Sequence, residues 1–365
     1  MRSLLKALPD PVFRNAGPVL LAVLAFALTA IALSTTLRAS QPAPFMQVLT
    51  PKLEHYEDQH AVYDTIVVGT SRTLYHVQPE AVETGMAEAG CSGRSVYNFG
   101  VFGLRGAELD WLIDQILADD RPSLKTVIME QPLEPHREFA RVTETRGRYF
   151  SGPSFFGQTM DAITTHAESA PKKVFRAAIA GYGTVYDLSG VGRAAEIAFP
   201  PAETIERDAF SFVEDGFEAL DDVQAEAVLA RNAAFRADID AFQGKLDRYR
   251  AQPRIGADQS ATYMIERLNL FKEAGYQPIF YASPSVDYLD LTPDVADAVS
   301  ALAPDLDVLN FNAPDQYPEL FDQGLWFDFG HMGRAGAEAF SRQFGEAICR
   351  AELARSEGEA IHAVR

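Results

Sequence analysis

The sequence predicts an α/β protein: a parallel β-sheet covered by helices on both faces, with a helical insertion and an N-terminal transmembrane helix. Short apolar, β-branched runs alternate with helical segments before residue 132 and again after residue 257, which is the pattern of a parallel sheet. Residues 133 to about 255 interrupt that alternation. A stretch without a charged residue, from Gly17 to Leu37, precedes the whole pattern.

The composition indicates a folded protein with a sizeable core. The chain has 365 residues, of which 47% are hydrophobic and 23% charged, enough for one large domain or two ordinary ones. Its formal net charge of -19 argues against a nucleic-acid partner, because phosphate binding requires a basic surface. No phosphate-binding glycine loop or dinucleotide fingerprint follows a predicted strand, so the sequence predicts no cofactor.

Residues 17–37 are expected to form a transmembrane anchor. A helix of this length spans about 30 Å, the thickness of the hydrocarbon core of a bilayer. Arg2, Lys6 and Arg14 lie in residues 1–16, which the positive-inside rule leaves in the cytoplasm. The sequence thus predicts a single-pass protein of the cytoplasmic membrane, with its catalytic domain on the periplasmic or extracellular side.

A cleaved signal peptide is the competing interpretation of this segment. Signal peptides normally have a shorter apolar core and a cleavage site flanked by small residues. The stretch that ends the apolar run, "LRASQPA", contains Arg38 and makes a poor site. The length of the apolar run therefore favours an uncleaved anchor.

The exported part is expected to comprise a linker at residues 38–60, an α/β domain at 61–350 and a C-terminal tail at 351–365. A helix is expected over 106–120, because its apolar residues share one face; they are Leu109, Leu112, Ile113 and Ile116. Five strands are expected over 65–69, 95–100, 125–132, 277–285 and 307–314. Ligands of parallel sheets bind at the carboxyl ends of the strands.

The insertion, residues 133 to about 255, is rich in aromatic residues and mostly helical in character. Apolar residues near its end recur at spacings of three, four and seven, which predicts one long amphipathic helix packed on the core. These residues are Val228, Phe235, Ile239, Phe242, Leu246 and Tyr249. We interpret the insertion as a cap over the site, with a simple packing subdomain as the alternative.

The cysteines and histidines give weaker signals. Cys91 and Cys349 are too few for a disulfide framework, although a single bridge in an oxidising compartment is left open. Residues 54–60 gather two histidines and several carboxylates next to the anchor, which fits a solvated charged stretch better than a metal site. No metal site is therefore predicted. His76 and His136 follow strand ends and are expected to line the mouth of the pocket.

A candidate catalytic triad comes from two distant segments. Gly69-Thr70-Ser71 ends the first strand, while Asp328 and His331 lie three residues apart before a C-terminal helix. An Asp can orient such a His, which then acts as general base for a serine hydroxyl. Each part has a plainer explanation, because a Ser or an Asp in these places is commonly a helix cap. The presence of both motifs at strand ends of one α/β domain favours the triad.

The order of three motifs resembles a known family. A strand followed by "GTSR", then "NFGVFG", then a terminal "DxxH" is similar to the blocks of the SGNH/GDSL hydrolase superfamily. Within that superfamily the chain more closely resembles the membrane-anchored envelope branch, which includes the alginate acetylation proteins and the DltD-like proteins. The resemblance covers most of residues 62–132 and 257–347. It implies a flavodoxin-like sheet, with Ser71 as nucleophile, His331 as base and Asp328 as the orienting carboxylate.

The resemblance also implies an oxyanion hole. Ser71 supplies its own amide, and the glycine of the second block maps onto Gly103, with Gly100 as second choice. The third block of the family supplies an Asn, but here the third strand ends in "MEQPLEP", where only Gln131 offers a side-chain amide. Loss of one such donor typically costs about 100- to 1000-fold in turnover.

Together, the residues and the resemblance predict a serine acyl-transfer enzyme acting on cell-envelope or exopolysaccharide glycans, as an O-acetyltransferase or O-acetylesterase. The expected partners are an acyl donor, an envelope glycan and a multi-span membrane O-acyltransferase. Arg72 and Asn98 are candidate substrate-binding residues, with a surface charge as the alternative for Arg72. The alternative function is a non-catalytic envelope scaffold or glycan-binding protein, which the missing Asn favours.

Overall fold

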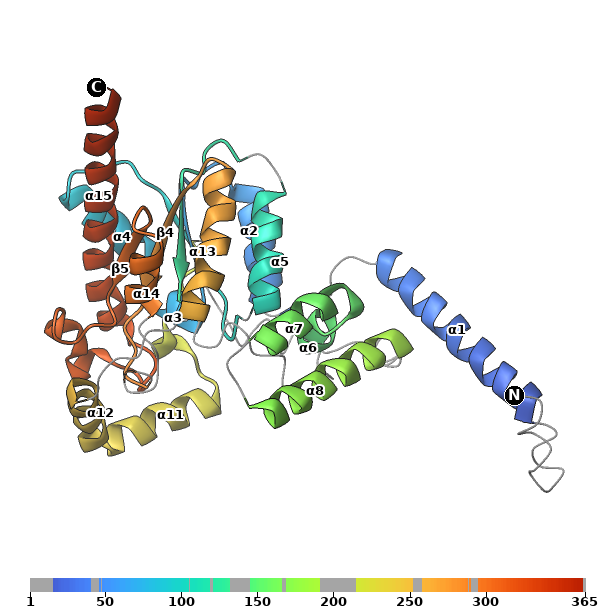
Figure 1. Cartoon of the computed structure of the whole chain (residues 1–365). Helices are drawn as coiled ribbons and strands as arrows, with labels where there is room; N and C mark the ends of the chain where they lie inside the picture. The colour runs from blue at the N-terminus through green and yellow to red at the C-terminus, as the bar shows by residue number, and fades with distance from the viewer. Residues whose placement is uncertain are drawn as a thin grey trace. The chain divides into compact units, whose positions relative to one another are not determined.

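The chain forms two compact units (Figure 1). A helical unit consists of Met1–Met46 and His136–Pro201, and a sheet unit consists of Gln47–Pro135 and Ala202–Arg365. The computed structural model describes residues 16–40, 46, 48–104, 106–118, 121–131, 145–165, 169–190, 215–251, 258–287, 289 and 295–363.

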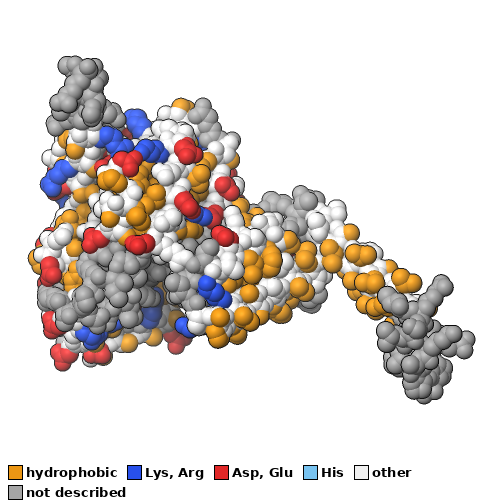
Figure 2. Space-filling view, in the orientation of Figure 1, with side chains coloured by type: hydrophobic (Ala, Val, Ile, Leu, Met, Phe, Trp, Pro, Cys, Tyr) orange, Lys and Arg blue, Asp and Glu red, His pale blue; other side chains and the backbone are white. Residues whose placement is uncertain are grey.

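The helical unit contains the predicted membrane span. The helices described in it are α1 (Ala16–Ser40), α6 (Thr145–Phe150), α7 (Pro153–Thr165) and α8 (Ala170–Ser189). Helix α1 is long enough and apolar enough over Gly17–Thr36 to cross a membrane. Its Ser34 hydroxyl donates to the carbonyl of Asp187 on α8 over 3.2 Å. Figure 2 shows hydrophobic side chains over α7 and α8 that continue onto α1.

The sheet unit is built on five parallel strands, which confirms the predicted α/β class. They are β1 (Thr65–Gly69), β2 (Val96–Gly100), β3 (Thr126–Glu130), β4 (Gln277–Ala282) and β5 (Asp307–Asn310), in the order β2-β1-β3-β4-β5. The first three strands are buried along their whole length, as expected for a sheet covered on both faces. The chain leaves β1 towards one side for β2 and returns on the other side for β3. This reversal places the carboxyl ends of β1 and β3 at the point where such sheets bind ligands.

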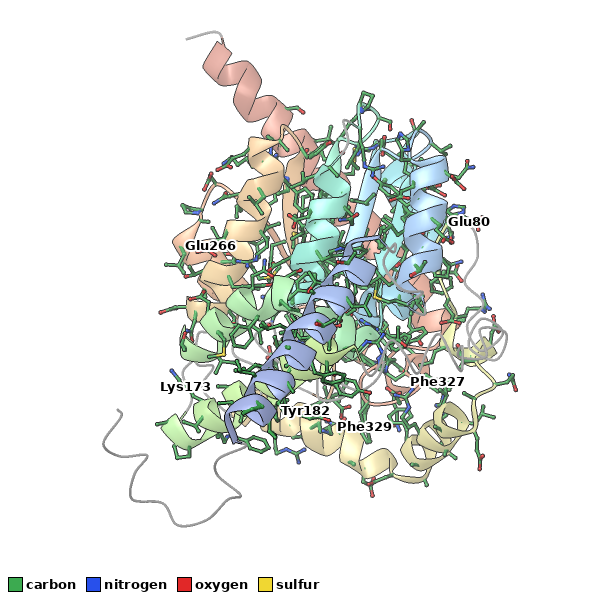
Figure 3. The ribbon with its side chains drawn as sticks, turned by 90° about the vertical axis from the view of Figure 1, so that its right-hand side faces the viewer. Glu80, Lys173, Tyr182, Glu266, Phe327 and Phe329 are labelled. Atoms are coloured by element: carbon green, nitrogen blue, oxygen red, sulfur yellow. A yellow bond between two sulfur atoms is a disulfide. The ribbon has the colours of Figure 1, made fainter. Side chains whose placement is uncertain are left out.

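Helices lie on both faces of the sheet (Figure 1). One layer contains α3 (Ser71–His76), α4 (Pro79–Glu88) and α15 (Arg334–Ala363), and the other contains α5 (Gly106–Leu117) and α13 (Asp258–Glu273). α14 (Val295–Leu302) packs near β4 and β5. Glu80 on α4 and Glu266 on α13 lie on the exposed sides of their helices (Figure 3). Short 3-10 helices are η3 (Leu220–Asp222), η4 (Pro318–Phe321) and η5 (Gln323–Leu325).

Two glycines allow α4 and α15 to pack unusually closely. A Cβ atom on Gly85 of α4 would lie 2.0 Å from the carbonyl oxygen of Arg342, and one on Gly345 of α15 would lie 2.0 Å from that of Val82. Any side chain at either position would therefore force the two backbones apart. Apolar side chains of the sheet and of both helices fill one core, which includes Val67, Val82, Met86, Ile128, Ile279, Tyr281, Phe340 and Phe344.

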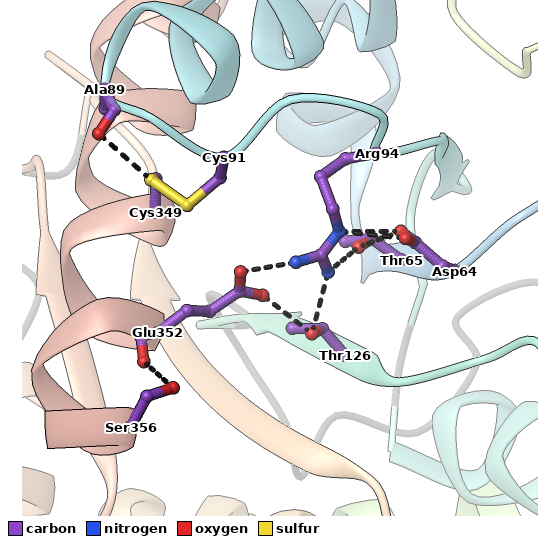
Figure 4. Close-up of a disulfide and its surroundings, with 9 residues drawn as sticks. All are labelled: Asp64, Thr65, Ala89, Cys91, Arg94, Thr126, Cys349, Glu352 and Ser356. Atoms are coloured by element: carbon purple, nitrogen blue, oxygen red, sulfur yellow. Dashed lines mark hydrogen bonds and ion pairs between the residues drawn. A yellow bond between two sulfur atoms is a disulfide. The ribbon is translucent and has the colours of Figure 1, made fainter. Parts of the chain in front are cut away.

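A disulfide joins the same two elements. Cys91, which follows α4, is bonded to Cys349 of α15 with a Cα–Cα distance of 5.7 Å, within the range usual for disulfides (Figure 4). The sequence left open whether Cys91 and Cys349 pair, and the structure shows that they do. Beside the bridge, the guanidinium of Arg94 contacts Asp64 and Glu352 and so ties α15 to the start of β1.

Two predicted boundaries at the ends of the sheet unit differ from the structure. Residues 49–59, predicted as linker, form helix α2 (Leu49–Gln59), because Leu49 and Tyr56 are fully buried and Tyr56 stacks on Tyr97 of β2. The predicted tail after residue 351 continues α15 as far as Ala363.

The insertion is divided between the two units. Residues 145–190 contribute α6, α7 and α8 to the helical unit, whereas residues 215–251 belong to the sheet unit. The predicted long helix is two helices, α11 (Glu226–Ala237) and α12 (Ile239–Ala251). Asp238 has a non-helical backbone and its carboxylate accepts from the Ala241 N–H, which starts the second helix. The predicted apolar residues Phe235, Phe242 and Leu246 are buried in the core.

Candidate active site

Ser71 stands at the turn from β1 into α3. Thr70 is the N-cap residue and its hydroxyl accepts from the Arg72 N–H over 3.4 Å. The preceding Gly69 allows the turn to pack tightly, because a Cβ there would lie 1.8 Å from the Thr73 hydroxyl and 2.4 Å from Glu130 Oε2. The sequence "GTSR" is therefore both a helix cap and the support of a half-buried serine.

Glu130, at the end of β3, holds this turn in place and is a residue that the sequence analysis missed. Its Oε2 accepts from the Thr70 N–H over 2.6 Å and from the Thr73 hydroxyl over 2.7 Å. The side chain is buried, with only 2% of the residue exposed. An acidic residue at the end of the apolar run "TVIME" was the available signal, because a buried carboxylate requires nearby donors or a cation.

Arg72 is the cation that accompanies Glu130, which corrects its assignment as a substrate-binding residue. Its Nε lies 2.6 Å from Glu130 Oε1 in an ion pair, although the Nε–H does not point at an acceptor. A terminal N–H donates to the carbonyl of Gln131 over 2.6 Å. The side chain is 5% exposed, so it is neither a surface charge nor available to a substrate.

The structure brings the three predicted catalytic residues together. Ser71 Oγ lies 2.9 Å from His331 Nε2, although 260 residues separate them in the chain. His331 Nδ1 lies 2.9 Å from Asp328 Oδ1 and 3.2 Å from Oδ2. All three distances are those of hydrogen bonds, and the order hydroxyl, imidazole, carboxylate is that of a serine triad.

Asp328 and His331 lie on a tight loop rather than on a helical turn. An isolated bridge between Trp326 and Met332 closes the loop, and α15 begins only at Arg334. Asp328 Oδ1 accepts the backbone N–H groups of Gly330 and His331, each over 2.8 Å. The carboxylate is thereby fixed before it meets the imidazole.

The pKa of Asp328 is held below its usual value. Burial alone would raise this pKa, but the hydrogen bond and charge of His331, the Gly330 N–H and the charge of Arg231 together outweigh it. Asp328 is therefore ionised at neutral pH, as a carboxylate that orients an imidazole must be.

His76 was predicted to line the mouth of the pocket, but it is buried and supports the loop of residues 326–332 instead. It is fully buried, its Nε2 accepts from the Met332 N–H over 3.0 Å, and its Nδ1 lies 2.9 Å from the Ser283 hydroxyl. Because Nε2 accepts, the proton of the neutral ring is on Nδ1. Burial lowers the pKa of His76 well below its ordinary value. His136 lies outside the described residues.

Helix α11 braces the same loop from the other side. Asn232 donates to the carbonyl of Phe327 over 2.6 Å and Arg236 to that of Trp326 over 3.1 Å. Arg231 lies 3.6 Å from Asp328 Oδ2 and is half exposed. Phe327 and Phe329, the chain neighbours of Asp328, are labelled in Figure 3. This part of the predicted cap therefore contacts the site loop directly, a role that helical periodicity alone does not reveal.

The three predicted oxyanion donors follow adjacent strands. Ser71, Gly103 and Gln131 come after β1, β2 and β3, whose carboxyl ends share one edge of the sheet. Of the backbone N–H groups of residues 70–73, only that of Ser71 has no acceptor within the described part of the chain. Gly103 is exposed in a turn with φ 65°. The second choice, Gly100, is occupied, because its N–H donates to Asn98 Oδ1.

Asn98 has a structural role, which corrects its assignment as a substrate-binding residue. Its amide donates to the carbonyls of Thr73 and Val77, and its Oδ1 accepts the Gly100 N–H. The side chain is fully buried. Asn98 therefore fastens α3 and the residue that follows it to β2, and it cannot reach a substrate.

Within the described stretches, no group of three His, Cys, Asp or Glu side chains is arranged to hold a metal ion. The geometry of the site instead supports proton transfer between Ser71, His331 and Asp328. Comparison of the chain with protein-family models, with curated proteins and with solved structures found no match.

Proposed function

We propose that the protein is a membrane-anchored serine acyl-transfer enzyme that acts outside the cytoplasm on O-acyl groups of envelope glycans. The observation that carries the proposal is the hydrogen-bonded series Ser71–His331–Asp328, with distances of 2.9 Å at each step. A serine hydroxyl is a weak nucleophile until a base removes its proton, and this arrangement supplies the base.

The residues suggest a two-step reaction. His331 Nε2 takes the proton of Ser71 as Oγ attacks the acyl carbonyl, and Asp328 stabilises the imidazolium that forms. The imidazolium then protonates the leaving alcohol, which departs and leaves an acyl ester on Ser71. In the second step His331 deprotonates water or a sugar hydroxyl, which takes the acyl group and restores the serine.

The tetrahedral oxyanion requires donors at the same edge of the sheet. We assign this role to the backbone N–H groups of Ser71 and Gly103, with the side-chain amide of Gln131 as the third donor. Gln131 is mostly buried directly after β3, beside the strand that carries Ser71. It takes the place of the Asn that SGNH-type enzymes use there.

The strand order supports the assignment to an SGNH-like fold. The order β2-β1-β3-β4-β5 is that of flavodoxin-like sheets, in which ligands bind where the order reverses. Ser71 and Gln131 follow the two strands at that reversal. The resemblance in sequence motifs and the strand order are two independent reasons for the same proposal.

Two features support a location outside the cytoplasm. Helix α1 can cross a membrane, and basic residues precede it in the sequence. The Cys91–Cys349 disulfide is of the kind that persists in oxidising compartments. We therefore place the sheet unit on the periplasmic or extracellular side.

The proposed substrates are acetyl esters, with a sugar hydroxyl or water as acceptor. The resemblance to the envelope branch favours the transferase, which would receive its acyl group with the help of a multi-span membrane O-acyltransferase. The acceptor chosen depends on how well water is excluded during the second step.

Labelling with a fluorophosphonate probe tests the proposed chemistry. The full-length protein in detergent should react covalently at Ser71 and should hydrolyse p-nitrophenyl acetate. Ser71→Ala and His331→Ala should abolish both, whereas Ser356→Ala, which removes an exposed hydroxyl of α15, should change neither. Absence of labelling in the wild type, together with glycan binding that Ser71→Ala retains, would instead favour the non-catalytic scaffold.

A further inference from the structure

Helix α8 of the helical unit has its polarity reversed relative to a helix of a water-soluble protein. Four of its large apolar side chains are exposed: Val174, Phe175, Tyr182 and Val185 are 70%, 67%, 55% and 66% exposed. At 100° per residue these four positions, with the exposed Ala178, fall on one side of the helix. We define these five residues as the α8 stripe.

The buried side of α8 is, in contrast, small and polar. Ala180, Gly183 and Asp187 face the interior of the unit. Asp187 forms an ion pair with Arg148 of α6 at 4.0 Å, with both side chains at most 5% exposed. A unit that buries an ion pair while it exposes valine and phenylalanine is poorly suited to water on that side.

The contact between α8 and α1 indicates that lipid covers the exposed apolar side of α8. Ser34 of α1 donates to the Asp187 carbonyl, and a Cβ atom on Gly190 would lie 3.3 Å from the same serine side chain. Ser34 lies near the end of the segment Gly17–Thr36 that can cross a membrane. The C-terminal end of α8 therefore lies next to the part of α1 that would emerge from the hydrocarbon core of the membrane. Hydrophobic side chains continue from α8 onto α1 in Figure 2.

Charge at the start of α8 agrees with a lipid surface. Lys172, Lys173 and Arg176 lie within its first two turns, on the flank away from the α8 stripe. Basic residues on the polar side and aromatic or aliphatic residues on the other are typical of helices that lie in the interface of a membrane. Lys173 and Tyr182 of α8 are labelled in Figure 3.

We propose that α8 is an interfacial helix, whose stripe is immersed in the acyl chains of the leaflet where α1 ends. Lipid is the occupant that the structure favours, because α1 and α8 are in contact and α1 itself requires lipid. The helix would hold the unit against the bilayer surface as a second attachment beside the span. This inference rests on the proposed membrane anchor and is independent of the chemistry at Ser71.

Quenching by brominated lipids tests the proposal. The full-length chain is reconstituted in vesicles of phosphatidylcholine and phosphatidylglycerol, with or without bromine on the acyl chains. A tryptophan is introduced by Phe175→Trp or by Val185→Trp, and the emission of the wild type, which contains Trp111 and Trp326, is subtracted. Circular dichroism confirms that each variant is folded.

Two further variants serve as controls. Val23→Trp, on the exposed side of α1, reports whether the anchor is inserted, and Leu270→Trp, at a 44% exposed position of α13, reports nonspecific proximity to the vesicle. We expect brominated lipid to quench the 175 and 185 probes at least half as strongly as the 23 probe, with little effect on the 270 probe.

Quenching at 23 without quenching at 175 and 185 would overturn the proposal while leaving the anchor intact. The stripe would then be left for a protein partner, which a photo-crosslinking residue at 175 could capture in cells. Absence of quenching at 23 would overturn the anchor and this inference with it, whereas loss of fluorophosphonate labelling would affect only the proposed chemistry.

Discussion

The backbone N–H of Met332 donates to Nε2 of His76 over 3.0 Å, and this bond links the loop that carries His331 to the helix that begins at Ser71. Met332 follows His331 in the loop, whereas His76 is the last residue of the helix that begins at Ser71. A neutral, buried imidazole thus helps to place His331 beside Ser71. Protonation of that ring would remove its acceptor and place an uncompensated charge in the core.

Stability should therefore decrease at acid pH through His76. Its pKa is lowered in the folded state, so between the folded value and the unfolded value of about 6.5 the unfolded chain binds more protons. The contribution of His76 to the free energy of unfolding is fully present above about pH 6.5 and is lost as the pH falls below it. Urea unfolding of the full-length protein between pH 7.5 and pH 5 measures this slope.

His76→Gln should lower stability at neutral pH and flatten the slope, because glutamine does not titrate. His60→Gln, in which the replaced imidazole lies near the surface, should keep the slope of the wild type. A His76→Gln protein with an unchanged slope would show that another group causes the acid sensitivity.

Asp328→Asn should reduce kcat by about 10⁴-fold, because the neutral amide neither stabilises the imidazolium nor enforces the productive tautomer of His331. Asn can still accept the Gly330 and His331 N–H groups, so the loop should keep its shape. The rate of p-nitrophenyl acetate hydrolysis is the measurement. Asp287→Asn, which changes a nearby carboxylate that pairs with Lys245, should remain within a few-fold of the wild type. Equal activity of the two variants would contradict the triad.

The Glu130–Arg72 pair should show strong coupling in a double-mutant cycle. Both side chains are almost fully buried, so Glu130→Gln or Arg72→Met alone should destabilise the protein by about 3–5 kcal/mol. The double variant should lose clearly less than the sum, because no uncompensated charge remains. Denaturant unfolding of the four proteins gives the coupling energy. Additive losses would mean that the pair does not act as a unit.

Asn232→Ala should reduce activity more than stability. The Asn232 amide fixes the Phe327 carbonyl, one residue before Asp328, and a misplacement of about 1 Å in a catalytic group can cost 100-fold in rate. We expect a decrease of about 10- to 100-fold in the rate of fluorophosphonate labelling, with a folded protein by circular dichroism. Glu226→Gln, at an exposed position of the same helix, is the matched control. Labelling at the wild-type rate in Asn232→Ala would show that α11 does not position the loop.

Sequence patterns were sufficient for the elements whose burial is regular along the chain, as a continuous apolar run or as one apolar helix face. The strands of the sheet coincide with apolar runs, and Phe235, Phe242 and Leu246 reach the core as their spacing predicts. It failed where a local event outweighs periodicity. Asp238 caps a new helix, although the apolar pattern runs through it without interruption. Tyr56 is fully buried and belongs to a helix, although the composition of that segment predicts a linker.

By itself, the sequence determined the α/β class and the apolar segment that can span a membrane. It also singled out Ser71, His331 and Asp328, which the structure brings together. These follow from local patterns and from the chemistry of single side chains. Only the tertiary structure decided that Arg72 and Asn98 are buried supports, that Glu130, His76 and Asn232 hold the site, and that Cys91 meets Cys349. Each of those roles depends on a partner distant in the chain, and a partner is set by packing, which no local pattern contains.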